Sequence, residues 1–365
     1  MPFKMIQVGT GGWGAAWCKH WLPPNIKDGL IEVVAAVDTN PDALVNAREG
    51  LGLRADQCYT DMRKAFDENK ADFCTVVVPP AFHEQVVDMA LAHELHILSE
   101  KPIADSLEAS VRIAAKVKSA GKKMGVTMSH RFDQDKTTLR RELRSGRNGA
   151  LDYLVCRFTC DCRKFASWGK FRHEIPDALM VEGAVHHLDI LADLAGATAD
   201  SRTTCDTIYA QTWNPPWGEY AGDSQGLVTM HFGNGTRAMY EGAKTNAIGL
   251  NGWANEYIRA ECANATVIMD QRRIERFAHV ADASWGDVHR STGEPIALME
   301  QPKWANTWLV EKFAHWLAGD QMMETNVEDN LQSVALIFAA IESSRSGQPV
   351  KVQALLDAAR RSQSA

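Results

Sequence analysis

A glycine-rich loop directly after a short apolar run constrains the fold of this chain more than any other feature. Residues 5–8 predict a buried strand, and Gly9-Thr10-Gly11-Gly12-Trp13-Gly14 follows with the spacing G-x-G-x-x-G. In a strand–turn–helix unit, such glycines allow a tight turn, close approach of the backbone to a pyrophosphate, and close helix–strand packing. The helix expected at residues 15–22, which Pro23-Pro24 should end, offers free N–H groups to phosphates. This segment therefore predicts a dinucleotide site.

The second predicted strand, residues 31–37, ends at Asp38. Asp38 lies 24 residues after Gly14, near the position where a carboxylate binds the ribose 2′-OH in dinucleotide-binding units. A carboxylate there repels a 2′-phosphate, and Thr39-Asn40 supplies no cation to accept one. The sequence therefore indicates NAD rather than NADP. The alternative interpretation of Asp38, a plain helix N-cap before Pro41, is the weaker one beside the glycine loop.

Strand and helix patterns continue to alternate through the first third of the chain. This alternation is typical of a doubly wound parallel sheet, and we assign residues 1–128 to a Rossmann domain. The remaining strands are expected at residues 73–78, 96–100 and 123–128, and the helices at 42–51, 61–69, 83–94 and 106–120.

Longer segments with period-two alternation follow, and we assign residues 129–365 to a second, α+β domain. Alternation of this kind indicates a large, mostly antiparallel open sheet with one face covered by helices. The strands are expected at residues 151–160, 201–213, 225–232, 236–246, 256–270 and 272–280, and the helices at 136–145, 177–196, 304–317 and 328–344.

Glu100-Lys101-Pro102 closes the predicted strand at residues 96–100. Lys101 therefore lies at the carboxyl end of a parallel strand, where open α/β sheets bind their ligands. An ammonium group beside a nicotinamide is a candidate for proton transfer. The alternative is a surface lysine before a turn that Pro102 fixes, and that interpretation would hold for an isolated Lys-Pro pair.

The helix at residues 177–196 contains Glu182-Gly183-Ala184-Val185-His186-His187-Leu188-Asp189. Glu182 and His186 are four residues apart and share one helical face, and Asp189 stays near it. Carboxylates beside an imidazole can orient it and hold its proton state. On this segment alone, a helix with one buried histidine and surface acids is the better interpretation.

Composition excludes several classes of protein. The net charge is −7 and no basic block is present, so nucleic acid is not an expected partner. No apolar run approaches the ~20 residues that a membrane span needs. The eight cysteines are scattered, and Cys160-Asp161-Cys162 lacks a second pair at zinc spacing, so no metal site is expected. With no leader pattern at the N-terminus, a cytoplasmic location is expected.

The motifs occur in the order seen in one family. The chain resembles the glucose–fructose oxidoreductase / inositol dehydrogenase / MocA (Gfo/Idh/MocA) family of NAD(P)-dependent sugar and polyol dehydrogenases. The likeness spans nearly the whole length, from the glycine loop to residues 344–350. The motifs that carry it are Gly9/Gly11/Gly14, Pro79-x-x-x-His83, Glu100-Lys101-Pro102, Glu182-x-x-x-His186-x-x-Asp189 and Asn251-Gly252-Trp253 with Glu256.

The resemblance implies hydride transfer between NAD and a secondary hydroxyl of a sugar, glycoside or cyclitol, with Lys101 and His186 as catalytic residues. It also implies a homodimer or homotetramer formed through the open sheet. Glu182 replaces the aspartate that is usual in the family, and we expect it to bind substrate. Cofactor contacts are expected from the glycine loop, Asp38, Pro79, His83, Glu100 and Lys101, and further substrate contacts from Asp189, Arg131, Trp168 and His187.

Other interpretations stay open. Arg131 could form an interdomain salt bridge instead of reaching substrate. The protein could be a glycoside hydrolase that retains NAD and cleaves by transient oxidation, which the absence of free NADH during turnover would reveal. A non-catalytic dinucleotide or sugar sensor is a third interpretation, but binding alone would need neither Lys101 nor His186.

Overall fold

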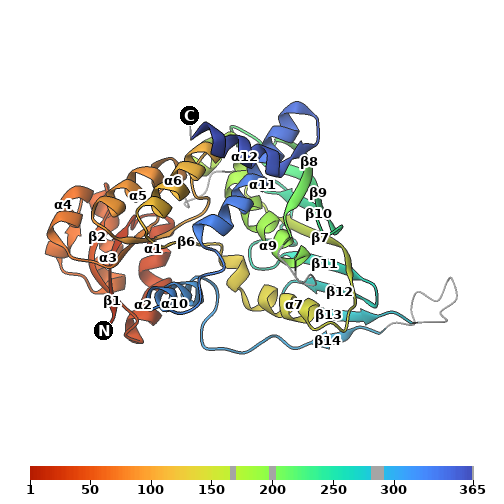
Figure 1. The fold of residues 1–365 in the computed structure, drawn as a ribbon, viewed down its shortest axis with the longest axis horizontal. Coiled ribbons are helices and arrows are strands. Elements are labelled where there is room, and N and C mark those ends of the chain that lie inside the picture. Colours follow the sequence, from red (N-terminus) through yellow and green to blue (C-terminus); the bar gives the residue numbers. More distant parts are fainter. Residues whose placement is uncertain (165–169, 197–202, 281–291, 364–365) are drawn as a thin grey trace.

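The protein contains two β-sheets that lie side by side (Figure 1). The strands of the first sheet lie within residues 3–126, and those of the second within residues 151–351. The computed structural model describes residues 1–164, 170–196, 203–280 and 292–363. Trp168, which was expected to contact substrate, lies outside the described residues.

The first sheet has six strands in the order β3-β2-β1-β4-β5-β6. All neighbouring strands pair in parallel, which confirms the predicted doubly wound sheet. The strand β3 was not predicted, because two half-buried residues give no recognisable pattern. The strands are β1 (Phe3–Val8), β2 (Ile31–Val37), β3 (Cys58–Tyr59), β4 (Phe73–Val76), β5 (His96–Ser99) and β6 (Met124–Val126).

Helices connect the strands of the first sheet. Asp61 and Ser106 cap two of them as their sequences predict, each accepting a hydrogen bond from a backbone N–H. Pro23-Pro24 begins a helix instead of only ending one, because proline suits the first helical turn. The helices are α1 (Trp13–Ala16), the π-helical η1 (Trp17–Trp21), α2 (Pro23–Lys27), α3 (Val45–Leu51), α4 (Met62–Glu68), α5 (His83–Ala92) and α6 (Leu107–Ser119).

The second sheet has nine strands in the order β14-β13-β12-β11-β7-β10-β9-β8-β15. Only β7 and β10 pair in parallel among these described strands. The single strand expected at residues 256–270 is two strands joined by a hairpin at Ala263-Asn264. The strands are β7 (Leu151–Thr159), β8 (Cys205–Trp213), β9 (Gln225–Phe232), β10 (Arg237–Ala243), β11 (Tyr257–Cys262), β12 (Ala265–Asp270), β13 (Arg273–Ala278), β14 (Glu294–Ile296) and β15 (Val350–Lys351).

Helices cover one face of the second sheet, with α9 and α11 packed against its strands (Figure 1). The opposite face carries exposed apolar side chains such as Leu227 and Met239. The last helix, α12, was not predicted. The helical segments are η5 (Ser129–Phe132), α7 (Gln134–Arg144), α8 (Phe171–Glu174), the π-helical η6 (Leu179–Ala184), α9 (Val185–Ala195), α10 (Ala305–Leu317), α11 (Val327–Ser346) and α12 (Val352–Ser362).

Helix α10 returns to the first sheet although it follows the second sheet in sequence. Its Leu309, Val310 and Phe313 share a buried core with Phe73 and Leu98. The rings of Phe73 and Phe313 meet edge to face with centroids 5.4 Å apart. Segments after residue 129 therefore contribute to the hydrophobic cores of both halves. None of the described helices combines the length and the apolar character that crossing a membrane requires.

Candidate active site

A large pocket lies at the carboxyl ends of the first sheet's strands. Such an edge is where open parallel sheets place their ligands. Residues from the second half close its other side. Its walls include Gly9, Gly11, Gly12, Trp13, Asp38, Pro79, Glu100, Lys101, His130, Glu182, His186 and Trp253. The structure thus brings together most of the predicted cofactor residues with Lys101, Glu182 and His186.

The glycine loop has the geometry that a pyrophosphate needs. A Cβ on Gly9 would lie 2.0 Å from the Val77 carbonyl oxygen, and one on Gly14 would lie 2.4 Å from the Gly9 carbonyl oxygen. Gly12 has a φ of +51°, and open space surrounds the place where its Cβ would be. These positions therefore admit only glycine without strain, and the loop backbone is bare where it faces the pocket. The loop fits a dinucleotide.

Asp38 joins the end of β2 to the glycine loop. Its Oδ2 accepts hydrogen bonds from the backbone N–H groups of Thr10 at 2.7 Å and Gly11 at 3.0 Å. Its Oδ1 accepts one from the Asn40 N–H at 2.9 Å. The carboxylate lines the pocket at this point, where its charge opposes a 2′-phosphate. This arrangement fits NAD.

Glu100 and His83 hold in place other segments of the chain that form the cofactor site. Oε1 of Glu100 accepts hydrogen bonds from the indole Nε1 of both Trp13 and Trp17, each at 2.8 Å, and so ties α1 and η1 to the end of β5. His83 is fully buried and is not among the residues that line the pocket. Its ring nitrogens lie 2.9 Å from the Val78 carbonyl and 3.1 Å from the Ile103 carbonyl. His83 therefore supports two segments of the pocket wall, and its expected contact with the cofactor stays a prediction.

Lys101 reaches across the pocket to the helix of the second half. Its Nζ donates a hydrogen bond to the backbone carbonyl of Glu182 at 2.8 Å. Burial lowers the pKa of the Lys101 ammonium, although the carboxylates of Glu182 and Glu100 oppose the change. A lysine with a lowered pKa can share a proton more readily near neutral pH.

The Glu182 carboxylate is held by cations. Its Oε2 lies 2.6 Å from Lys244 Nζ, and its Oε1 lies 3.2 Å from Arg172 Nε. Burial by itself raises the pKa of Glu182, but Lys244, Lys101 and Arg172 outweigh it and bring the pKa to about 2. The carboxylate is therefore charged. Sequence reasoning missed Arg172 and Lys244, because no motif links them to Glu182.

His186 follows the π-helical turn η6 and lines the pocket beside Glu182. Such turns occur often at functional sites. The His186 ring stacks on that of His130 with centroids 4.5 Å apart, and His186 Nδ1 has no hydrogen-bond partner within the part of the chain that the structure describes. Burial lowers the pKa of His186 well below its ordinary value, and the neighbouring His130 and Lys101 lower it further. A neutral imidazole of this kind can accept a proton.

Three residues expected at the substrate lie behind the pocket wall. Arg131 and Asp189 pair with each other at 2.6 Å, with side chains at most 7% exposed. His187 is fully buried, and its Nδ1 lies 3.0 Å from the Tyr240 hydroxyl. None of the three is among the residues that line the pocket. In the structure Arg131, Asp189 and His187 are thus buried side chains, and their expected contacts with substrate stay predictions.

Comparison with known proteins agrees with this geometry. Two family models match, "Oxidoreductase family, NAD-binding Rossmann fold" over residues 3–128 and "Oxidoreductase family, C-terminal alpha/beta domain" over residues 149–352. The chain belongs to the Gfo/Idh/MocA oxidoreductase family, with an NAD-binding Rossmann domain.

Individual relatives span different shares of the chain. It is 51% identical to the uncharacterized protein y4oX of Sinorhizobium fredii, over 99% of this chain and 98% of that protein. It is 29% identical to an inositol 2-dehydrogenase of Corynebacterium glutamicum, over 53% of this chain and 55% of that enzyme. The crystal structure of an Agrobacterium radiobacter oxidoreductase with NAD⁺, L-tartaric acid and magnesium superposes with a TM-score of 0.81. It is 20% identical and covers 97% of this chain and 100% of that one.

Proposed function

We propose that this protein is a dehydrogenase that uses NAD to oxidise a secondary hydroxyl of a sugar, glycoside or cyclitol, or catalyses the reverse reduction. The observation that carries the proposal is the shared pocket. Lys101 from the end of β5 and His186 from α9 line the same cavity as the glycine loop. The named activity of the inositol 2-dehydrogenase relative supports a cyclitol or a sugar as substrate.

Each site residue has a defined task in this reaction. NAD held by the glycine loop and Asp38 would supply the hydride acceptor for the carbon that carries the hydroxyl. The neutral imidazole of His186 takes the hydroxyl proton, so that both the C–H and O–H bonds break as the carbonyl forms. The Lys101 ammonium holds the same oxygen, where it stabilises the negative charge that develops or shares the proton. Glu182 accepts hydrogen bonds from neighbouring substrate hydroxyls.

The sheet face opposite α9 and α11 supports the proposal of a homo-oligomer. Alternate residues of β9 are exposed there, including Leu227, and Met239 of β10 is exposed on the same sheet. Burial of these apolar side chains against a second copy would stabilise a dimer or tetramer.

A substrate screen tests the proposed activity. The full chain is mixed with NAD and a panel of monosaccharides, glycosides, sugar acids and inositols, and NADH formation is followed by absorbance. We expect reduction with at least one compound of the panel, and release of free NADH with each turnover. Cleavage of a glycoside without free NADH would instead identify an NAD-retaining hydrolase. Tight NAD binding without reduction by any compound of the panel would contradict the proposed activity.

A further inference from the structure

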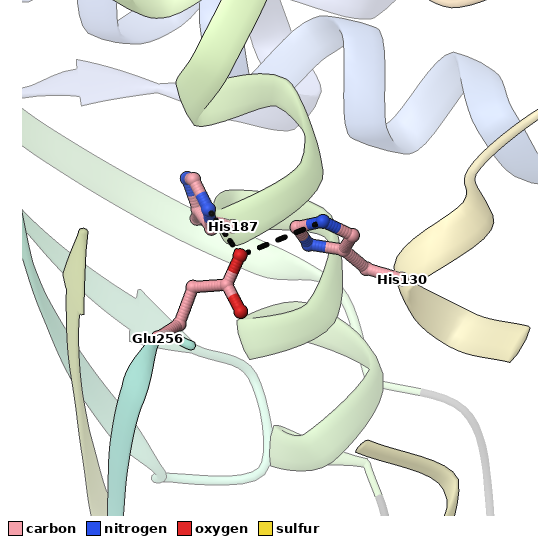
Figure 2. Close-up of side chains that lie close together, drawn as sticks. All are labelled: His130, His187 and Glu256. Atoms are coloured by element: carbon pink, nitrogen blue, oxygen red, sulfur yellow. Dashed lines mark ion pairs between the residues drawn. The ribbon is translucent and has the colours of Figure 1, made fainter. Parts of the chain in front are cut away.

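Two histidines and a glutamate from distant parts of the chain meet behind the pocket wall. Figure 2 shows His130 from η5 and His187 from α9 directed towards the carboxylate of Glu256, next to the start of β11. All three side chains are buried, with 9% exposure for His130 and 0% for the other two. Each residue has one atom that could bind a metal, and these three atoms lie within 4.8 Å of one another.

The distances within this cluster do not correspond to hydrogen bonds. The Nε2 atoms of His130 and His187 each lie 3.6 Å from the same Oε1 of Glu256, whereas an N–H···O bond spans about 2.9 Å. Two ligands of one tetrahedral zinc ion lie about 3.4 Å apart, given bonds of roughly 2.0–2.2 Å. The two distances from the imidazoles to Glu256 thus match the edges of a coordination shell better than hydrogen bonds, and the two imidazole nitrogens lie within 4.8 Å of each other.

The other contacts of two of the three residues hold their metal-binding atoms in place. His187 Nδ1 lies 3.0 Å from the Tyr240 hydroxyl, while its Nε2 is buried and has no hydrogen-bond partner among the described residues. A histidine that binds a metal through one ring nitrogen generally forms a hydrogen bond through the other. Oε2 of Glu256 lies 2.7 Å from Lys136 Nζ, and Oε1 faces the two imidazoles while also accepting a hydrogen bond from the Ala254 N–H at 3.1 Å.

The surrounding charges favour an added cation. Lys136 lies 3.4 Å from Asp133 and 3.5 Å from Asp135, in addition to its contact with Glu256. With both imidazoles neutral, these three carboxylates and the Lys136 ammonium carry a formal charge of −2, which the nearby Lys101 ammonium partly offsets at the two histidines. The remaining excess of negative charge favours a cation.

We propose that His130, His187 and Glu256 form a binding site for a divalent first-row transition metal ion of the zinc class. Two imidazoles and one carboxylate select such ions over magnesium and calcium, which prefer all-oxygen shells. Three protein ligands leave one tetrahedral position for a water or another oxygen. His130 also lines the pocket, and its ring stacks on His186. The ion would therefore fix the wall against which His186 is oriented. The site does not depend on the proposed substrate.

Metal analysis of the tag-free full chain tests this site. The protein is stripped with a chelator, dialysed, exposed to excess Zn²⁺ or Co²⁺, and freed of unbound ion. We expect one ion per chain by elemental analysis, and a Co²⁺ absorption spectrum of tetrahedral type. We also expect added Zn²⁺ to raise the melting temperature of the wild type. A wild-type chain that keeps no stoichiometric ion overturns the proposal without any variant.

Substitutions locate the ion. His187→Gln and Glu256→Gln should each lower ion content at least tenfold and abolish the Zn²⁺-dependent rise in melting temperature. His130→Gln, at the pocket surface, repeats the test with less disturbance of the core. The matched control is His315→Gln, at an exposed histidine that pairs with Asp320, and it should keep one ion per chain. If folded ligand variants, judged by retained NAD binding, keep the ion as the control does, the assignment of the ligands is wrong.

Discussion

Asp189 and Arg131 form a buried bidentate ion pair between α9 and η5. Asp189 Oδ1 and Oδ2 accept hydrogen bonds from Arg131 Nη2 and Nε at 2.6 and 2.8 Å. Ser333 of α11 also donates to Asp189, and Arg131 Nη2 lies 3.1 Å from Asp329 of the same helix. One pair of charges thus fixes three elements around the pocket wall that carries His186.

Asp189→Asn should therefore destabilise the fold strongly. Removing one partner of a buried pair costs about 3–5 kcal/mol, and the lower end is expected here because Arg131 keeps its contact with Asp329. Urea unfolding at neutral pH measures the change. The matched control is Asp56→Asn in the exposed Arg54–Asp56 pair, with side chains about 70% exposed, which should leave stability nearly unchanged. Equal stability of the two variants would show that the buried pair is not a structural element.

Lys101→Ala should lower turnover by roughly 10²–10⁴, the range expected for acid–base assistance, while NAD binding stays near the wild-type value. The reason is that Lys101 Nζ lies in the pocket, whereas the cofactor loop is built from other residues. Lys101→Arg should rescue little, because a guanidinium does not release its proton at working pH. Steady-state kinetics and an NAD titration measure both effects, and near-normal turnover of Lys101→Ala would remove this residue from the reaction.

Stability at acid pH should report the charge of Glu182. Its pKa in the folded protein is about 2, against an ordinary value of 4.5. Because the folded pKa is the lower one, the stabilisation is complete above about pH 4.5 and is lost as the pH falls towards 2. The difference in unfolding free energy between wild type and Glu182→Gln should be constant near neutrality and shrink through this window.

Two further measurements test the role of Glu182. Lys244→Met removes the closest cation from the carboxylate, so it should destabilise the protein by about 3–5 kcal/mol at neutral pH. In kinetics, Glu182→Gln should mainly raise KM if the carboxylate binds substrate hydroxyls. A wild-type to Glu182→Gln difference that stays unchanged down to about pH 3 would mean that the cations do not depress the pKa.

Cofactor preference should follow Asp38. The double change Asp38→Ser with Thr39→Arg removes a repulsive charge and adds a partner for a 2′-phosphate, so the ratio of NADP to NAD affinity should rise at least tenfold. Fluorescence titration with both dinucleotides measures the ratio. Tighter binding of NADP than of NAD by the wild type would contradict the role given to Asp38.

Oligomer formation should depend on the open face of the second sheet. Leu227 is 47% exposed and Met239 is 45% exposed, and a glutamate at either position would place a charge where apolar contact is expected. Light scattering after gel filtration should show a dimer or tetramer for the wild type and a smaller species for Met239→Glu. Met322→Glu, at a 62% exposed methionine outside the sheet, is the control and should keep the wild-type mass.

The sequence predicted the first sheet well because its longer strands are buried on both faces and each is followed by a helix. It predicted Lys101 and His186 in one pocket because each belongs to a short local motif. Contacts between residues that are far apart in the sequence were not predictable in this way. Lys244 meets Glu182 from 62 residues away, and His130, His187 and Glu256 are separated by 57 and 69 residues. No spacing rule links such residues, since only the fold of the second sheet brings them together.

Local patterns also failed where short elements or turns interrupt them. Ala263-Asn264 forms a hairpin without glycine or proline, so β11 and β12 read as one strand. The pairing of Glu100 with Trp13 and Trp17 was hidden for a different reason. Because Glu100 belongs to a known motif, we expected it to contact the cofactor, whereas its carboxylate accepts hydrogen bonds from two tryptophans of the protein.

The position of α10 has a consequence for synthesis of the chain. Phe73 and Leu98 of the first sheet are covered by residues 309–313, which leave the ribosome more than two hundred residues later. The core of the NAD-binding half therefore cannot be completed until residues 309–313 have been made, and an isolated fragment ending near residue 128 would expose that apolar surface. A chimaera that exchanges the NAD-binding domain between relatives would therefore also need the matching α10. The structural unit that contains the first sheet is thus discontinuous in sequence.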